Sequence, residues 1–271
     1  MHMAKKNTIR INDTDIDTWL DSDREKLEQV PAEETTLRYD KRLVAFLDLL
    51  GITDLVLQAG DGEESEIIAR LEKIKEIVSI EAKEYIDASG LDLLHLSDSF
   101  IFACSEDLLP NMLDLLCIIQ MRILIECQTM LRGALEYGSV IVKDDGRQII
   151  GPAYIKAYRK QERDAIYPRI IISNSVLSLI KSKFSTYTSI IISYDRENTL
   201  DCVKAYCDRE GGRNATISRL KREGVYDYLI GEYKRFDKED KSPERRKYGW
   251  MINYLSEKEV WPNDRKYLDW Q

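Results

Sequence analysis

The chain has 271 residues, of which 44% are hydrophobic and 32% charged, and its net charge at pH 7 is −8. This length is enough to bury a sizeable core, and the acidic balance argues against nonspecific nucleic-acid binding by the whole chain. The five cysteines form no CxxC pair and there are only two histidines, so no structural zinc site can be recognised in the sequence.

Residues 1–37 are polar and acidic, and Trp19 with a few aliphatic residues supplies their apolar face. We interpret them as an N-terminal segment, either a short helix docked on the rest of the chain or a solvated tail anchored by the tryptophan. No secretory signal is visible in it, so a reducing, cytoplasmic location is expected. Cys104, Cys117 and Cys127 lie in apolar runs and are predicted to be small core residues.

A buried strand is predicted over Arg42–Leu49, with a carboxylate, Asp48, inside it. Aspartate is disfavoured in strands, and a buried charge must be paired or bound to a metal. A second carboxylate, Asp98, separates the apolar runs Leu91–Leu96 and Phe100–Cys104, a pattern that predicts a hairpin with Asp98 at its tip. Two carboxylates at the ends of adjacent strands suit Mg²⁺ or Mn²⁺, which in turn suit a nucleoside triphosphate.

The other elements are predicted from apolar periodicity and from the positions of glycine and proline. The apolar stretch Leu108–Leu131 is interrupted by charged residues, so a buried helix is expected and not a membrane span. Helices are predicted over 52–58, 65–88, 106–130, 152–165 and 175–182, and strands over 131–142, 148–150 and 168–173.

This order of elements is a split βαβ unit followed by strand, helix and strand. It predicts a ferredoxin-like α+β core with a mainly antiparallel sheet and flanking helices. From about residue 190 the composition changes to charged segments rich in aromatic residues. We therefore predict an acidic N-terminal segment (1–37), a central domain (38–190) and a helical C-terminal extension packed on that domain (191–271).

Four short motifs follow one another along the central domain. They are Phe46–Gly51, Ser97–Ser99, Leu131–Gly133 and Gly151–Tyr154. In this combination, residues 41–173 resemble a class III nucleotidyl cyclase catalytic domain, and the segment from Ala157 to Ile170 is most similar to the Pycsar anti-phage pyrimidine cyclases. The resemblance implies an enzyme that converts UTP or CTP into the 3′,5′-cyclic nucleotide, cUMP or cCMP, and pyrophosphate. The product would be a second messenger in bacterial anti-phage defence, sensed by a separate effector.

The resemblance also implies a metal site and an assembly. Two ions, Mg²⁺ or Mn²⁺, would be bound by Asp48, Asp98 and the carbonyl of Leu49. The protein would be a homodimer paired head to tail, in which one subunit supplies the two aspartates and the other supplies contacts to the base and the transition state. No membrane and no nucleic acid is expected as a partner.

Phosphate contacts are expected at one turn and at two arginines. By the resemblance, Leu50, Gly51 and Ile52 open a helix whose backbone N–H groups can hold phosphates. Arg132 and Arg169 are alternative phosphate ligands, because arginine can bind phosphate with two parallel hydrogen bonds. A surface ion pair is the other interpretation of each arginine.

The expected base and transition-state positions depart from the family pattern. Purine cyclases have a charged base-reading residue where this chain has Leu94, and a second reader where it has Gln148, which can both donate and accept hydrogen bonds. The family's transition-state asparagine would fall on Ile155, and its arginine on Arg159 or, in a second alignment, on Lys160. A purine cyclase with an unusual base pocket and a catalytically silent nucleotide-binding module therefore remain alternatives.

Overall fold

The structure is a computed structural model that describes residues 38–52, 64–143, 148–239 and 242–262. The fold described below belongs to the unit Tyr39–Gln271. The predictions for residues 1–37 and, apart from Ile52, for a helix over 52–58 lie outside the described residues.

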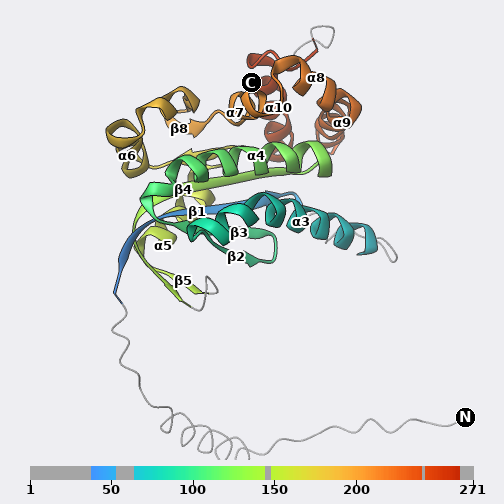
Figure 1. Cartoon of the computed structure of the whole chain (residues 1–271). Coiled ribbons are helices and arrows are strands. Elements are labelled where there is room, and N and C mark those ends of the chain that lie inside the picture. Colours follow the sequence, from blue (N-terminus) through green and yellow to red (C-terminus); the bar gives the residue numbers. More distant parts are fainter. Residues whose placement is uncertain (1–37, 53–63, 144–147, 240–241, 263–271) are drawn as a thin grey trace, which may run out of the picture. The chain divides into compact units, whose positions relative to one another are not determined.

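The strands form one mainly antiparallel sheet (Figure 1). Its order is β2–β3–β1–β4–β6–β8–β7, and β5 pairs with the last residues of β4. The pair β4–β6 is parallel, whereas β1 is antiparallel to both β3 and β4. The strand bounds are β1 Asp40–Leu50, β2 Asp92–Leu96, β3 Ser99–Cys104, β4 Met130–Lys143, β5 Gln148–Ile150, β6 Ile170–Ile172, β7 Ile191–Tyr194 and β8 Glu197–Leu200.

The first four strands and two helices form a ferredoxin-like core. Helix α3 (Glu64–Ser89) comes between β1 and β2 in the chain, and α4 (Leu109–Cys127), after the 3₁₀ turn Glu106–Leu108, comes between β3 and β4. Because β3 pairs with β1 and separates it from β2, the spatial order is β2–β3–β1–β4, as in a split βαβ unit. The predicted α+β fold with a mainly antiparallel sheet and flanking helices is therefore confirmed.

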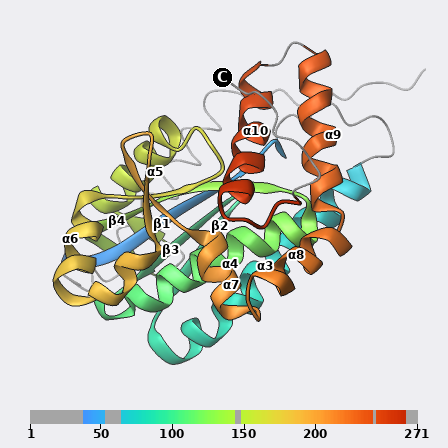
Figure 2. The same ribbon diagram turned by 90° about the horizontal axis from the view of Figure 1, so that it is seen from above.

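Different helices cover the two faces of the sheet (Figures 1 and 2). Successive strand residues point to opposite faces. On β1, Leu43 and Leu47 belong to the large cluster formed with α3 and α4. Val44 and Phe46 belong to a smaller cluster under α5 (Pro152–Asp164). This alternation decides on which face the side chain of Asp48 lies.

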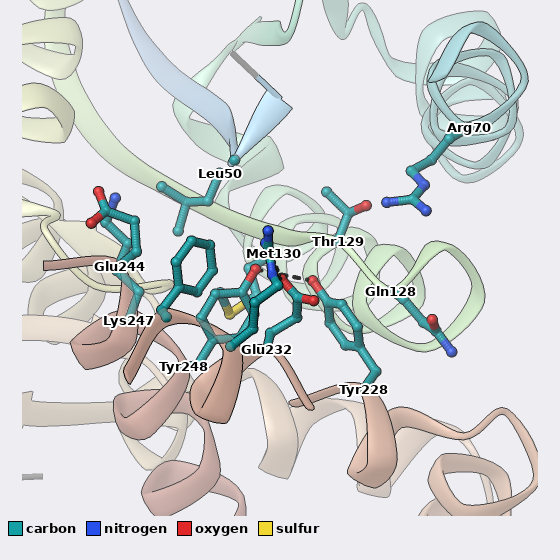
Figure 3. Close-up of a pocket in the computed structure, with 13 residues that line it drawn as sticks. Leu50, Arg70, Gln128, Thr129, Met130, Tyr228, Glu232, Glu244, Lys247 and Tyr248 are labelled. Atoms are coloured by element: carbon teal, nitrogen blue, oxygen red, sulfur yellow. Dashed lines mark hydrogen bonds and ion pairs between the residues drawn. The ribbon is translucent and has the colours of Figure 1, made fainter. Parts of the chain in front are cut away.

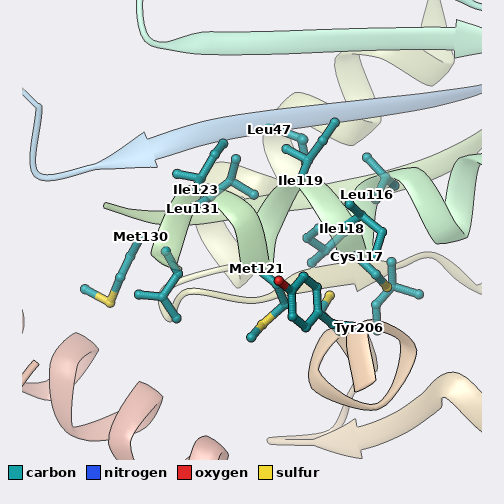
Figure 4. Close-up of a cluster of buried hydrophobic side chains, with 14 of the residues drawn as sticks. Leu47, Leu116, Cys117, Ile118, Ile119, Met121, Ile123, Met130, Leu131 and Tyr206 are labelled. Atoms are coloured by element: carbon teal, nitrogen blue, oxygen red, sulfur yellow. The ribbon is translucent and has the colours of Figure 1, made fainter. Parts of the chain in front are cut away.

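Helix α4 lies at the centre of the larger core. Figure 4 shows Ile119 and Ile123 on the side of the sheet residues Leu47 and Leu131, with Tyr206 on another side. By length and composition the segment Glu106–Cys127 could cross a membrane, but 72% of its most apolar window is buried inside the protein. The expectation of a buried core helix is confirmed.

The chain after residue 190 begins with a hairpin that the sequence analysis did not predict. Strands β7 and β8 pair with each other, and β8 adds to the sheet beside β6. The turn residues Asp195 and Arg196 both have positive φ, 50° and 65°, as in the two-residue turns that join tight hairpins. From Cys202 the described part of the extension consists of helices and their connections, as predicted. Its helices are α7 Cys202–Arg209, α8 Arg213–Arg222, α9 Val225–Lys238 and α10 Ser242–Glu257; α6 (Asn174–Lys183) precedes the hairpin.

A group of charged side chains fastens the C-terminal helices to α3 and α4. Arg122 of α4 pairs with Glu81 at 2.6 Å and with Glu126 at 2.7 Å. Arg209 of α7 reaches Glu81 at 3.0 Å, and Arg219 of α8 reaches Glu126 at 2.8 Å. Because each carboxylate is shared between the core and the extension, the extension packs on the core through charge as well as apolar contact.

Candidate active site

Asp48 lies on the α5 face of the sheet, two residues after Phe46 and two before the end of β1. Its neighbours in the ladder are Ser99 on β3 and Arg132 on β4. Nε of Arg132 donates to Oδ2 of Asp48 at 3.0 Å, and Nη2 lies 2.9 Å from the same oxygen in an ion pair. Oγ of Ser99 donates to Oδ1 at 3.3 Å, and Nε2 of Gln161 on α5 donates to Oδ2 at 3.1 Å. The strand aspartate is therefore paired, as its position required.

Asp98 lies in the turn between β2 and β3, at the tip of the predicted hairpin. Its backbone carbonyl accepts a hydrogen bond from the N–H of Leu49 at 3.1 Å, so the turn is fastened to β1 directly after Asp48. Burial raises the pKa of Asp48; the charge and hydrogen bond of Arg132 lower it, and the charge of Asp98 raises it. The structure thus brings the two predicted carboxylates together.

The chemistry of this end of the sheet fits a hard divalent cation. Within the described ranges, no group of three or more His, Cys, Asp or Glu side chains gathers at one point, so the two carboxylates and nearby backbone oxygens are the donors on offer. Such oxygen donors are those that Mg²⁺ and Mn²⁺ prefer. The guanidinium of Arg132 already balances Oδ2 of Asp48, which shows that positive charge is stabilised beside this carboxylate.

The turn after Asp48 has the backbone geometry expected of a tight strand exit. Gly51 has a φ of +85°, a backbone conformation that residues other than glycine rarely adopt. Leu50 and Ile52 on either side of it are buried. Ile52 is the last described residue before 64, so a phosphate-binding role for this turn stays a prediction.

Arg169 is occupied by protein groups. Its side chain is buried, at 4% exposed, although Asp195, its ion-pair partner, is exposed. Its Nη1 donates to the carbonyl of Tyr194 at 3.0 Å and lies 3.5 Å from Asp195, and its Nη2 donates to the carbonyl of Asp164 at 3.2 Å. Arg169 therefore ties the end of α5 to the β7–β8 turn, and a phosphate contact from it stays a prediction.

Leu94 and Gln148 lie at different places relative to the aspartate pair. The side chain of Leu94 packs against the cluster under α5, two strands away from β1. Gln148 is exposed at the start of β5 and faces Lys143, eleven residues along β4 from Arg132. Eleven strand residues span roughly 35 Å. One chain therefore does not bring Gln148 and the aspartates to one point.

Arg159 and Lys160 both lie on α5, with different surroundings. Arg159 is exposed, and among the described residues no carboxylate pairs with it. Lys160 is paired with Glu197 at 2.7 Å and with Asp164 at 3.5 Å. Of the two residues that the alignments offer, Arg159 is thus the one that no described carboxylate neutralises. Its transition-state role stays a prediction.

Gln161 is a site residue that the sequence analysis missed. With Ala153 and Ala157 it forms the buried face of α5, at a spacing of four residues. A polar residue continuing a line of small buried residues was the available signal. Its partner became visible only when α5 was placed over β1.

No protein-family model and no curated protein matches this chain. Solved structures do match, and they include adenylyl and guanylyl cyclase domains. The guanylyl cyclase domain of the RhoGC fusion protein from the aquatic fungus Blastocladiella emersonii is 19% identical, with 60% of this chain and 94% of that chain covered and a TM-score of 0.44.

A bacterial light-regulated adenylyl cyclase is 14% identical, covering 70% of this chain and 66% of that chain with a TM-score of 0.45. A class III adenylyl cyclase-like ATP-binding protein from Pseudomonas aeruginosa is 12% identical, covering 72% and 50% with a TM-score of 0.49. All of these matches are distant. The fold and the site described above rest on the strand order and contacts of this chain alone.

Proposed function

We propose that this chain is a metal-dependent nucleotidyl cyclase that converts UTP or CTP into the 3′,5′-cyclic nucleotide and pyrophosphate. The observation that carries the proposal is the meeting of Asp48 and Asp98 at one end of a ferredoxin-like sheet, with Arg132 in the same register. Two carboxylates and an arginine are the groups that a triphosphate and its cations require.

In the proposed reaction the ribose 3′-hydroxyl loses its proton to water, and its oxygen attacks the α-phosphorus. The new O–P bond forms as the bond to the β-phosphate breaks and pyrophosphate leaves. Asp48 and Asp98 would hold Mg²⁺ or Mn²⁺, which would supply positive charge to the triphosphate and lower the pKa of a bound hydroxyl. The guanidinium of Arg132 leaves Asp48 and binds phosphate oxygens instead. Ser99 and Gln161 hold the carboxylate of Asp48 in place.

The pyrimidine preference is proposed from Leu94 and Gln148. Leu94 is uncharged and half-buried against the cluster under α5, so it offers no charged reader for a purine. The exposed amide of Gln148 can bond the polar edge of a smaller base. A site that hydrogen-bonds a substrate edge discriminates against analogues that lack it.

A head-to-tail homodimer would join what the single chain keeps apart. Gln148 and the aspartate pair lie at opposite ends of β4, so a second copy must supply the missing half of each site. Three large apolar side chains on β5 and α5 are open to solvent, Ile150 at 54%, Ile155 at 47% and Tyr158 at 41%. Exposed apolar groups gathered in this way favour a protein interface.

The biological role that we propose follows from the resemblance to the Pycsar cyclases. The cyclic nucleotide would act in the cytoplasm as a second messenger in anti-phage defence. A separate protein would be the effector that it activates.

Paired variants test the metal site. Asp48→Asn and Asp98→Asn should each abolish Mn²⁺-dependent formation of cyclic product while the far-UV circular dichroism stays that of the wild type. Asp92→Asn is the matched control, because Asp92 lies on the same hairpin but pairs with Arg42 at 2.5 Å instead of facing the site. Near-wild-type turnover by either of the first two variants would show that the assignment of the two aspartates is wrong.

A further inference from the structure

A pocket of about 460 Å³ lies between the end of β1 and the C-terminal helices α9 and α10 (Figure 3). One wall is formed by Leu50, the last residue of β1, and by Gly51 in the turn that follows. Met130 of β4 lies next to them. Asp48, Asp98 and Arg132 do not line this pocket. It is therefore a space distinct from the candidate active site, although it touches the strand that carries Asp48.

Two cations of the pocket have no ion-pair partner among the described residues. Arg70 of α3 and Lys247 of α10 face it from opposite sides (Figure 3), and no described carboxylate pairs with either of them. The third cation, Arg235, is already paired with Glu232 at 2.5 Å. Glu244 lies beside Lys247 in Figure 3, so the uncompensated positive charge is greatest at Arg70. An anionic group is favoured there.

Aromatic side chains from α9 and α10 form the opposite wall. The rings of Phe236 and Tyr248 stack with centroids 5.5 Å apart, and the hydroxyls of Tyr228 and Tyr248 lie 3.4 Å from each other. Burial raises the pKa of Tyr228 to about 12 and also raises that of Tyr248, so both hydroxyls keep their protons. One hydrogen bond joins the two hydroxyls, which leaves one proton to donate to a ligand.

We propose that this pocket binds a nucleotide, independently of the reaction at Asp48. The phosphate lies at Arg70 and the hydroxyl of Tyr228, and the base lies against Phe236 and Tyr248. Concave sites of this size, with an aromatic wall and a few converging polar groups, are typical of small-ligand binding, and arginine is the residue best suited to phosphate. A ligand there would contact the last residues of β1. The inference does not depend on the proposed cyclase activity.

Calorimetric titration of the full chain in EDTA tests this proposal without any turnover. EDTA removes the divalent cations on which binding at the two aspartates depends. ATP and UTP are the probes, and inorganic tripolyphosphate shows what the phosphates contribute alone. We expect at least one nucleotide to bind, more tightly than tripolyphosphate. Arg70→Ala should weaken that binding about tenfold or more, since it removes the charged hydrogen-bond donor to the phosphate.

Matched cations outside the pocket serve as controls. Lys83→Ala on α3 and Arg246→Ala on α10 remove exposed charges that do not line the pocket, and both should bind like the wild type. Asp48→Asn should also bind normally. The proposal is overturned if neither nucleotide binds at millimolar concentration, if Arg70→Ala binds like the wild type, if tripolyphosphate binds as tightly as the nucleotides, or if Asp48→Asn loses binding.

Discussion

Gly133 lies on β4 one residue after Arg132 and faces Leu47 of β1. A Cβ atom at this position would lie 2.4 Å from Cδ2 of Leu47 and 2.7 Å from the carbonyl oxygen of Phe46. The leucine methyl can turn away, whereas the carbonyl belongs to a strand held in register by β4. Gly133→Ala must therefore push the two strands apart next to the Asp48–Arg132 pair.

The cost follows from the packing. An extra methyl in a well-packed core costs about 1–3 kcal/mol, and in a protein of this size about 1 kcal/mol lowers Tm by roughly 2–4 °C. We therefore expect Gly133→Ala to melt roughly 2–12 °C below the wild type, measured by circular dichroism. Turnover measured well below the melting range should fall too, because the variant displaces the residues around Asp48.

Gly231→Ala is the matched control. Gly231 is an exposed position inside α9, and a Cβ there meets nothing within 4 Å. Alanine is the better helix former by about 1 kcal/mol, so this variant should melt at or above the wild-type temperature. If Gly133→Ala melted with the wild type while the control behaved as expected, the close approach of β1 and β4 would not exist in solution.

Three other substitutions test separate parts of the molecule. The hydrogen bond of Arg122 lowers the pKa of Glu126. The ionised carboxylate therefore stabilises the fold at any pH above the ordinary glutamate pKa, and this contribution is lost as the pH falls through the lowered pKa of the folded state. Glu126→Gln should therefore lower the free energy of unfolding in urea at pH 7, and the difference should shrink in acid. Arg169→Ala removes the donor to two backbone carbonyls and should cost about 2 kcal/mol in the same assay; lost turnover with unchanged stability would instead support a phosphate contact. Leu94→Lys would bury an ammonium group where the base is proposed to lie, and it should lower pyrimidine turnover; full activity would exclude Leu94 from the base pocket.

The elements from β1 to α6 could be predicted because each has a strong local pattern. Strand β1 is an apolar run of the right length, α3 repeats its apolar residues with a period of 3.6, and Gly151-Pro152 marks the start of α5. The β7–β8 hairpin lacks such signals. Its strands are four residues long, and its turn, Asp195-Arg196, contains no glycine. It is held by pairing with β6, which no local pattern can reveal.

The candidate site, like the fold, could be predicted from the sequence only in part. An aspartate inside an apolar strand and a second one at a hairpin tip could be recognised from chemistry alone. The partners of Asp48 required the register of β1 with β4 and the placement of α5, since Arg132 and Gln161 lie 84 and 113 residues away in the sequence. The pocket between β1 and the C-terminal helices depends wholly on tertiary packing, because its walls come from α3, α9, α10 and the strand ends.

Product identification with the four nucleoside triphosphates tests the central claim most directly. The purified protein is incubated with ATP, GTP, UTP or CTP and Mn²⁺, and the products are separated and identified by mass spectrometry. We expect a 3′,5′-cyclic pyrimidine nucleotide and an equal amount of pyrophosphate from UTP or CTP, with little product from the purines and none from Asp48→Asn. Preference for ATP or GTP would contradict the pyrimidine assignment and leave the cyclase intact. The absence of cyclic product from all four triphosphates would contradict the account as a whole.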